Sequence, residues 1–68
     1  MAEYISYLKK YRLLAELTQE ELAEKVNVRR ETIIRLESAK YNPSLKLAIE
    51  ISRVLNTPIE EIFVFGEF

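Results

Sequence analysis

The 68-residue sequence contains no cysteine and no histidine. The first absence excludes disulfide bonds, thiolate zinc sites and a cysteine nucleophile, and the second excludes a histidine general base. One glycine and two prolines are too few for the many tight turns of an all-β fold. Because 49% of the residues are apolar and 31% are charged, the composition is that of a folded domain. We therefore expect a single all-α domain over residues 1–68.

Long apolar runs and catalytic patterns are also missing from the sequence. No run approaches the roughly 20 apolar residues of a membrane span, and the N-terminus lacks the pattern of a signal peptide, so we expect a cytoplasmic protein without a membrane partner. The remaining carboxylates, hydroxyls and amines form no triad-like pattern, so no enzyme activity is expected. We also expect no cofactor, no small-molecule ligand and no metal site, and interpret Glu20, Glu21 and Glu24 as a solvated helix face.

The charge is small in total but unevenly distributed. The formal net charge is −1, yet residues 29–46 carry five basic side chains against two glutamates. The segments on either side of this stretch, 16–28 and 47–68, are acidic. If the fold places the basic side chains on one face, they can bind a polyanion; otherwise they are ordinary solvated surface.

Helix signals recur at close spacing along the chain. Periodicity predicts a first helix over residues 5–14. Thr18 and Glu21 form a capping-box pattern that starts a second helix at about 19–26. Asn27 follows this helix, and asparagine tolerates the left-handed backbone of a tight turn.

Three more helices follow in the second half of the sequence. The third is expected over about residues 30–38. Ser44 is positioned to cap a fourth helix, which ends at Asn56. Thr57, with a proline directly after it, predicts a short fifth helix over about 58–63 with Thr57 as its cap.

Residues 18–38 have the parts of a helix-turn-helix. In this motif the first helix crosses the DNA backbone, and the second enters the major groove by its N-terminal end. The second helix must therefore expose hydrogen-bond donors near its start. Arginine suits this position, because its guanidinium can donate two hydrogen bonds to one guanine.

The sequence 18–28, the segment 32–37 and the loop 40–45 resemble the Cro/Xre-type, phage-repressor-like helix-turn-helix regulators, and the resemblance continues through 55–63. It is closest in kind to minimal five-helix homodimers of the cytolysin-repressor type. The resemblance implies an all-α, five-helix DNA-binding domain in which Tyr4–Ser6 and Phe63–Phe65 can pair as a short antiparallel β-ribbon. It also implies a regulator of transcription that binds double-stranded DNA.

The resemblance also implies roles for individual residues. Arg12 and Glu37 correspond to a structural ion pair. Arg30, Glu31 and Arg35 correspond to residues that face the edges of the bases. We interpret Ile34 as a partner for a thymine methyl group, so the expected base-reading residues are Arg30, Glu31, Ile34 and Arg35. The resemblance implies phosphate contacts by Gln19, Thr32 and the loop residues Lys40, Tyr41 and Asn42. We add three cationic side chains, so the expected phosphate contacts are Lys9, Lys10, Gln19, Arg29, Thr32, Lys40, Tyr41 and Asn42. The alternatives are solvated charges, a good helix former at Gln19 and an exposed Ile34 without a role.

Four positions depart from the family pattern. Asn27 and Ala39 stand where glycine is usual, and Arg29 replaces a serine helix cap at an expected cost of about 0.5–2 kcal/mol. Glu31 replaces a common glutamine. Its carboxylate requires either a cytosine amino group or an ion pair with Arg35, one helical turn later.

The C-terminal segment, about residues 56–68, adds apolar surface to a chain too small for a large core. We expect a dimer interface there, formed by Ile62, Val64, Phe65 and Phe68. The alternative is that these side chains fold back onto their own subunit. The resulting hypothesis is a homodimeric repressor at a palindromic operator. A protein-interaction module on the same fold, antitoxin-like or accessory, is the second hypothesis, because the charge outside 29–46 is acidic.

Overall fold

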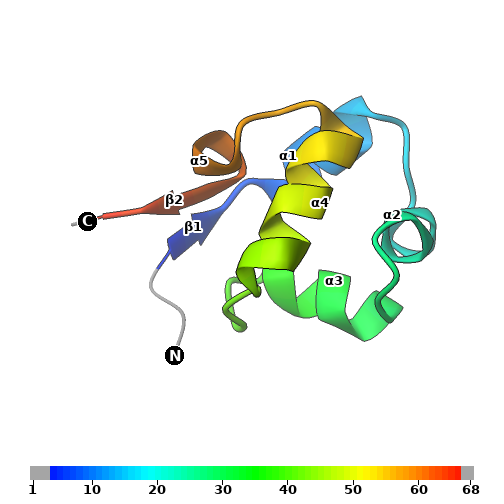
Figure 1. Ribbon diagram of the computed structural model, residues 1–68, viewed down its shortest axis with the longest axis horizontal. Coiled ribbons are helices and arrows are strands. Elements are labelled where there is room, and N and C mark those ends of the chain that lie inside the picture. The colour runs from blue at the N-terminus through cyan, green and yellow to red at the C-terminus, as the bar shows by residue number, and fades with distance from the viewer. Residues whose placement is uncertain (1–3, 67–68) are drawn as a thin grey trace.

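The computed structural model describes residues 4–66 and contains five helices and a two-stranded antiparallel sheet (Figure 1). In chain order the elements are β1 (Tyr4–Ser6), α1 (Leu8–Leu14), α2 (Gln19–Lys25), α3 (Arg30–Glu37), α4 (Leu45–Leu55), α5 (Ile59–Ile62) and β2 (Phe63–Phe65). The predicted fold class and the terminal β-ribbon are confirmed. Within residues 4–66, every helix is too short to cross a membrane.

Local capping signals determine where α2 and α4 begin. The Glu21 N–H donates to the Thr18 hydroxyl at 3.0 Å, and the Thr18 N–H donates to the Glu21 carboxylate at 2.8 Å. This is the predicted capping box, and its hydrogen bonds from Thr18, the backbone one first, hold the pKa of Glu21 below its usual range. Ser44 caps α4 by accepting the Leu47 N–H at 3.1 Å. Asn27, with φ of 57°, makes the turn between α2 and α3.

The predicted start of α1 and the predicted cap of α5 are wrong. Helix α1 begins at Leu8 rather than at residue 5, because residues 4–6 pair with β2 and are therefore extended. Helix α5 begins at Ile59 and has no side-chain cap. The Thr57 hydroxyl instead donates to the Leu55 carbonyl at 2.9 Å, which orients it toward the end of α4, and it accepts no amide at the start of α5.

The core joins all five helices and the ribbon. Figure 1 shows α4 in the middle of the view, with α3 below it, α2 to one side and the ribbon to the other. The fully buried large side chains are Leu8, Leu22, Ile33, Leu36, Ile51, Ile62 and Phe63. The expectation that Ile62 belongs to a dimer interface is therefore wrong. Helix α5 is a single turn that packs against α4, and the Ile62 side chain is buried in the core of its own subunit.

The ribbon has two chemically different faces. Tyr4 pairs with Phe65, Ile5 with Val64 and Ser6 with Phe63. Because directly opposed residues of an antiparallel pair share a face, Tyr4, Phe63 and Phe65 lie on one side. Ile5 and Val64 lie on the other side, where Ile5 is 42% exposed.

Candidate nucleic-acid interface

Helix α3 presents a polar face to solvent and an apolar face to the core. Its buried residues are Ile33 and Leu36. The four residues predicted to read bases are all exposed, namely Arg30, Glu31, Ile34 and Arg35. Helical periodicity explains this separation, because residues 33 and 36 lie on one side of the helix. We refer to the four exposed residues as the α3 surface.

A shallow hollow joins the α3 surface to the loop that follows it. It is lined by Arg29, Glu31, Thr32, Arg35 and Tyr41. The fold thus brings predicted base-reading and phosphate-binding residues to one place. Across the described residues, Glu31 and Arg35 do not form the ion pair that their spacing allows, so both side chains remain available to a ligand.

An ion pair between Arg12 and Glu37 links α1 to α3. The Arg12 Nε lies 2.6 Å from Glu37 Oε2, and each side chain is 8% exposed. Arg12 also donates to the Leu17 carbonyl at 2.8 Å, ahead of α2. The expected structural pair is therefore present, and its burial makes it a point where three segments are held together. Removing one partner of such a pair leaves an uncompensated buried charge.

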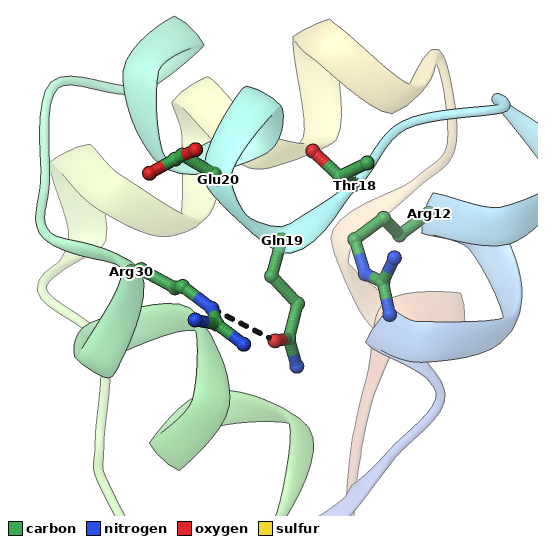
Figure 2. Close-up of a pocket in the computed structure, with 5 residues that line it drawn as sticks. All are labelled: Arg12, Thr18, Gln19, Glu20 and Arg30. Carbon is green, nitrogen blue, oxygen red and sulfur yellow. Dashed lines mark hydrogen bonds between the residues drawn. The ribbon is translucent and has the colours of Figure 1, made fainter.

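A chain of hydrogen bonds leads from this ion pair to the α3 surface. Gln19 Nε2 donates to Glu37 Oε1 at 3.0 Å. At the other end of the same amide, Gln19 Oε1 accepts from Arg30 Nε at 3.3 Å, which is the bond drawn in Figure 2. A carboxylate can only accept, so Glu37 determines which end of the Gln19 amide points toward Arg30. Because Arg30 uses Nε in this contact, its two terminal nitrogens make no hydrogen bond to any of residues 4–66. These nitrogens can provide the paired donors that recognise guanine.

The start of α3 is less well capped than that of α2. Arg29 occupies the N-cap position in an extended conformation and makes no side-chain cap hydrogen bond. The first amides of α3 consequently lack a side-chain acceptor. A phosphate oxygen can fill this role, and the Arg29 side chain is exposed beside it.

The loop after α3 exposes Lys40, Tyr41 and Asn42. It begins at Ala39, whose φ of 57° lies in the left-handed region. The Lys40 N–H donates to the Arg35 carbonyl at 2.9 Å and thereby closes the end of α3. The three predicted phosphate contacts therefore lie directly beyond the helix that carries the base-reading residues.

Sequence reasoning missed Tyr4. Its side chain is buried, and its hydroxyl donates to the Tyr41 carbonyl at 2.6 Å. Burial raises the pKa of the Tyr4 hydroxyl, which favours the protonated, donating form. Strand alternation could have marked Tyr4 as inward-facing, but only once the register of β1 against β2 was known.

The two lysines of α1 are exposed, but they are not equivalent. The Lys10 ammonium lies 5.2 Å from the centre of the Tyr11 ring, and the Tyr11 hydroxyl contacts Glu61 of α5 at 3.4 Å. Lys10 is also two positions from Arg12, which faces α3, so the two side chains point to nearly opposite sides of α1. The structure therefore does not bring Lys10 to the α3 surface, and phosphate contacts remain predictions for both lysines.

The remaining expected interface residues lie on or beyond the ribbon. Phe65 is 59% exposed, and Val64 is half-buried beside Ile5 on the outer face. Phe68 lies outside the described residues. Ile5 was not predicted for the interface. Once the ribbon was assumed, its position opposite Val64 could have predicted that it shares the same apolar face.

Comparison with known proteins agrees with this geometry. The helix-turn-helix family model HTH_3 matches residues 8–62. An HTH-type transcriptional regulator of Archaeoglobus fulgidus is 60% identical over 60 residues, which are 88% of this chain and 84% of the relative. Another from Methanocaldococcus jannaschii is 53% identical over 60 residues, covering 88% of this chain and 91% of the relative.

Solved structures show the same arrangement. A Bacteroides fragilis protein described as DNA-binding has a TM-score of 0.76 and 25% identity, over 93% of this chain and 98% of that one. The restriction-modification controller protein C.AhdI from Aeromonas hydrophila has a TM-score of 0.72 and 26% identity, over 79% and 82% of the two chains. The chain belongs to the Cro/Xre-type helix-turn-helix family, which comprises DNA-binding transcriptional regulators and not enzymes.

Proposed function

We propose that the protein is a homodimeric repressor that binds a palindromic operator in double-stranded DNA and blocks promoter access. The observation that carries this proposal is the contact of the exposed Arg30 with Gln19, whose amide is oriented in turn by the buried Glu37 carboxylate. A side chain already ordered in the free protein loses less conformational entropy when it binds. The arrangement suits a helix that reads bases.

Each exposed group on the α3 surface has a matching partner in the major groove. Arg30 and Arg35 donate to guanine, and Glu31 accepts from the cytosine amino group. Ile34 is 40% exposed, which suits contact with a thymine methyl group.

Phosphate contacts flank this reading surface on both sides. They come from Lys9, Gln19, Arg29, Thr32, Lys40, Tyr41 and Asn42. Such contacts fix the position of the protein on the duplex without reading sequence. The formal net charge of −1 adds little general attraction to DNA. Binding away from the operator should therefore be weak and sensitive to salt.

The outer face of the ribbon is the proposed dimer surface. Ile5 and Val64 place apolar area there, and Phe65, on the opposite face, adds a ring that is 59% exposed at the end of the ribbon. A two-fold dimer through this surface can space two α3 helices about 34–36 Å apart, which is one turn of DNA. That spacing requires a palindromic site.

The test is selection of binding sites from random duplex DNA by the purified protein, with the double variant Arg30→Ala/Arg35→Ala in parallel. We expect an enriched palindrome with half-sites about 10 base pairs apart, lost in the double variant. The matched control, Lys25→Ala/Arg53→Ala, removes two exposed cations outside α3 and should retain the site. If no sequence is enriched at moderate salt, the proposal is wrong, and the second hypothesis of a protein-interaction module gains support.

A further inference from the structure

Tyr4 connects the ribbon to the loop that follows α3. Its side chain is 5% exposed. Its hydroxyl donates to the Tyr41 carbonyl at 2.6 Å and lies 3.4 Å from the Leu36 carbonyl in the last turn of α3. The contact spans 37 positions of sequence, so it joins two segments that are not neighbours along the chain.

The loop has few other anchors. Its start is held by the Lys40 N–H on the Arg35 carbonyl, and its end by the Ser44 cap on α4. Between these two points, the Tyr4 hydroxyl makes the only hydrogen bond to residues 41–43 that the described part of the chain contains. The position of the exposed loop residues therefore depends on this one donor.

The Tyr4 ring is itself held by the ribbon. It packs edge-on against Phe63, with ring centres 5.5 Å apart, and lies 5.1 Å from the ring of Phe65. Backbone pairing of β1 with β2 sets the register of these three rings. The hydroxyl is thus presented from a rigid base and not from a flexible side chain.

We propose that Tyr4 is a positioning residue for DNA binding, which fixes the loop 40–42 so that Lys40 and Asn42 meet the phosphate backbone. This inference rests on the proposed function, because the phosphate contacts that Tyr4 would position are those of the proposed DNA complex. Tyr4 itself touches no DNA. Its contribution is made through the Tyr41 carbonyl.

The test compares the salt dependence of DNA binding in four proteins. These are the wild type, Tyr4→Phe, Lys40→Ala and the double variant. Each phosphate contact contributes about 0.9 to the slope of log K against log salt. We expect Lys40→Ala to lower the slope by about 0.9 in the wild-type background and to have little further effect in Tyr4→Phe. A role in stability alone would leave the effect of Lys40→Ala the same in both backgrounds.

Tyr7→Phe is the matched control. It makes the same chemical change at a residue that is 41% exposed and whose hydroxyl has no protein partner among the described residues. We expect a wild-type slope. Tyr4→Phe keeps the ring and both aromatic contacts, so the variant should fold, which circular dichroism can verify. A wild-type slope for Tyr4→Phe, with Lys40→Ala equally effective in both backgrounds, would overturn the proposal.

Two further measurements separate this inference from the proposed function. The slopes are measured on a selected site and on a random-sequence duplex, because phosphate contacts form on both. Equal affinity for the two duplexes overturns the sequence-specific repressor but leaves the comparison of slopes valid. Without DNA, exchange of the Lys40 amide, which donates to the Arg35 carbonyl where the loop begins, should be faster in Tyr4→Phe than in Tyr7→Phe. Equal exchange in the two variants overturns the role of Tyr4.

Discussion

The helix-turn-helix and the terminal ribbon are stabilised in different ways. Around α2 and α3, side-chain hydrogen bonds connect Arg12, Glu37, Gln19 and Arg30 in one series. Around β1 and β2, aromatic rings and aliphatic side chains pack together, and α5 is one turn without a side-chain cap. Polar contacts fix direction, because donors and acceptors have preferred geometry, whereas apolar packing is non-directional. The first region is therefore suited to orienting a reading side chain, and the second to burying area.

The largest expected effect comes from breaking the buried ion pair. Glu37→Ala leaves the Arg12 guanidinium buried without its carboxylate, which should lower the free energy of unfolding by about 3–5 kcal/mol. A domain of this size rarely has more than about 3–5 kcal/mol in total, so the variant should be largely unfolded. Chemical denaturation followed by circular dichroism measures this.

The double variant Arg12→Met/Glu37→Leu separates folding from orientation. Replacing both charges with apolar groups of similar size is often neutral for stability, so most of the loss should be recovered. DNA affinity should stay below that of the wild type, because Gln19 has lost the acceptor that sets its direction. A single variant, Glu37→Ala, with wild-type stability would show that the pair does not hold α1 to α3.

The second effect concerns the ribbon. The double variant Ile5→Thr/Val64→Thr keeps β-branched residues suited to a strand but removes the apolar outer face. Each change occurs twice in a symmetric dimer, so we expect the dimer dissociation constant to rise at least about 30-fold, equivalent to roughly 2 kcal/mol. Sedimentation equilibrium measures it. Leu14→Gln and Leu45→Gln remove exposed leucines elsewhere and should leave association unchanged; association lost equally in these controls would refute the ribbon interface.

A third prediction sharpens the contrast between capping and DNA binding within α3. Arg29→Ser supplies the missing side-chain cap and should raise the free energy of unfolding by about 1 kcal/mol. The same change removes a proposed phosphate contact, so the salt slope of DNA binding should fall by about 0.9. Thermal melts and binding titrations together give the answer. Improved stability with an unchanged slope would remove Arg29 from the phosphate contacts.

Ala39→Gly is expected to have a smaller, stabilising effect. Alanine has a φ of 57° there, a conformation that glycine adopts without steric cost. We expect the free energy of unfolding to rise by about 0.5–1 kcal/mol. Ala15→Gly is the control, since Ala15 has a φ of −85° and glycine should destabilise that position. The same sign at both positions would show that the left-handed conformation is not the cause.

The smallest effect is a pH dependence at the start of α2. The folded-state pKa of Glu21 lies below its ordinary value of 4.5, so its contribution to stability is complete above about pH 4.5 and is lost as the pH falls further. Glu21→Gln keeps an acceptor for the capping box but cannot titrate. The difference in Tm between wild type and variant should therefore be larger at pH 7 than at pH 3. A difference independent of pH would contradict this.

Signals close together in the sequence were predictive. The capping box of Thr18 and Glu21, the turn at Asn27 and the cap at Ser44 all act within a few residues, and all are present. Contacts between residues far apart in the sequence could not be predicted from such local patterns. The Arg12–Glu37 pair spans 25 positions and was expected only from the family resemblance.

The errors have a common physical origin in tertiary packing. Threonine is a common helix cap, yet the Thr57 hydroxyl donates to the Leu55 carbonyl and caps no amide of α5. Ile62 lies next to an apolar C-terminal segment in the sequence, yet as the last residue of α5 it is fully buried in the core. Tyr4 shows no signal in a strand of three residues, because its role depends on the register with β2 and on where α3 ends.

The pairing of Tyr4 with Phe65 also sets an order in time. This pairing closes a loop over most of the chain, and long-range closure is slow and entropically costly compared with forming helices. During synthesis β2 leaves the ribosome after every helix that it helps to enclose. The reading helix can therefore form before the ribbon closes, while the surface proposed for dimerisation exists only afterwards. Association of two copies through this surface would then have to wait until β2 has been synthesised and has paired with β1.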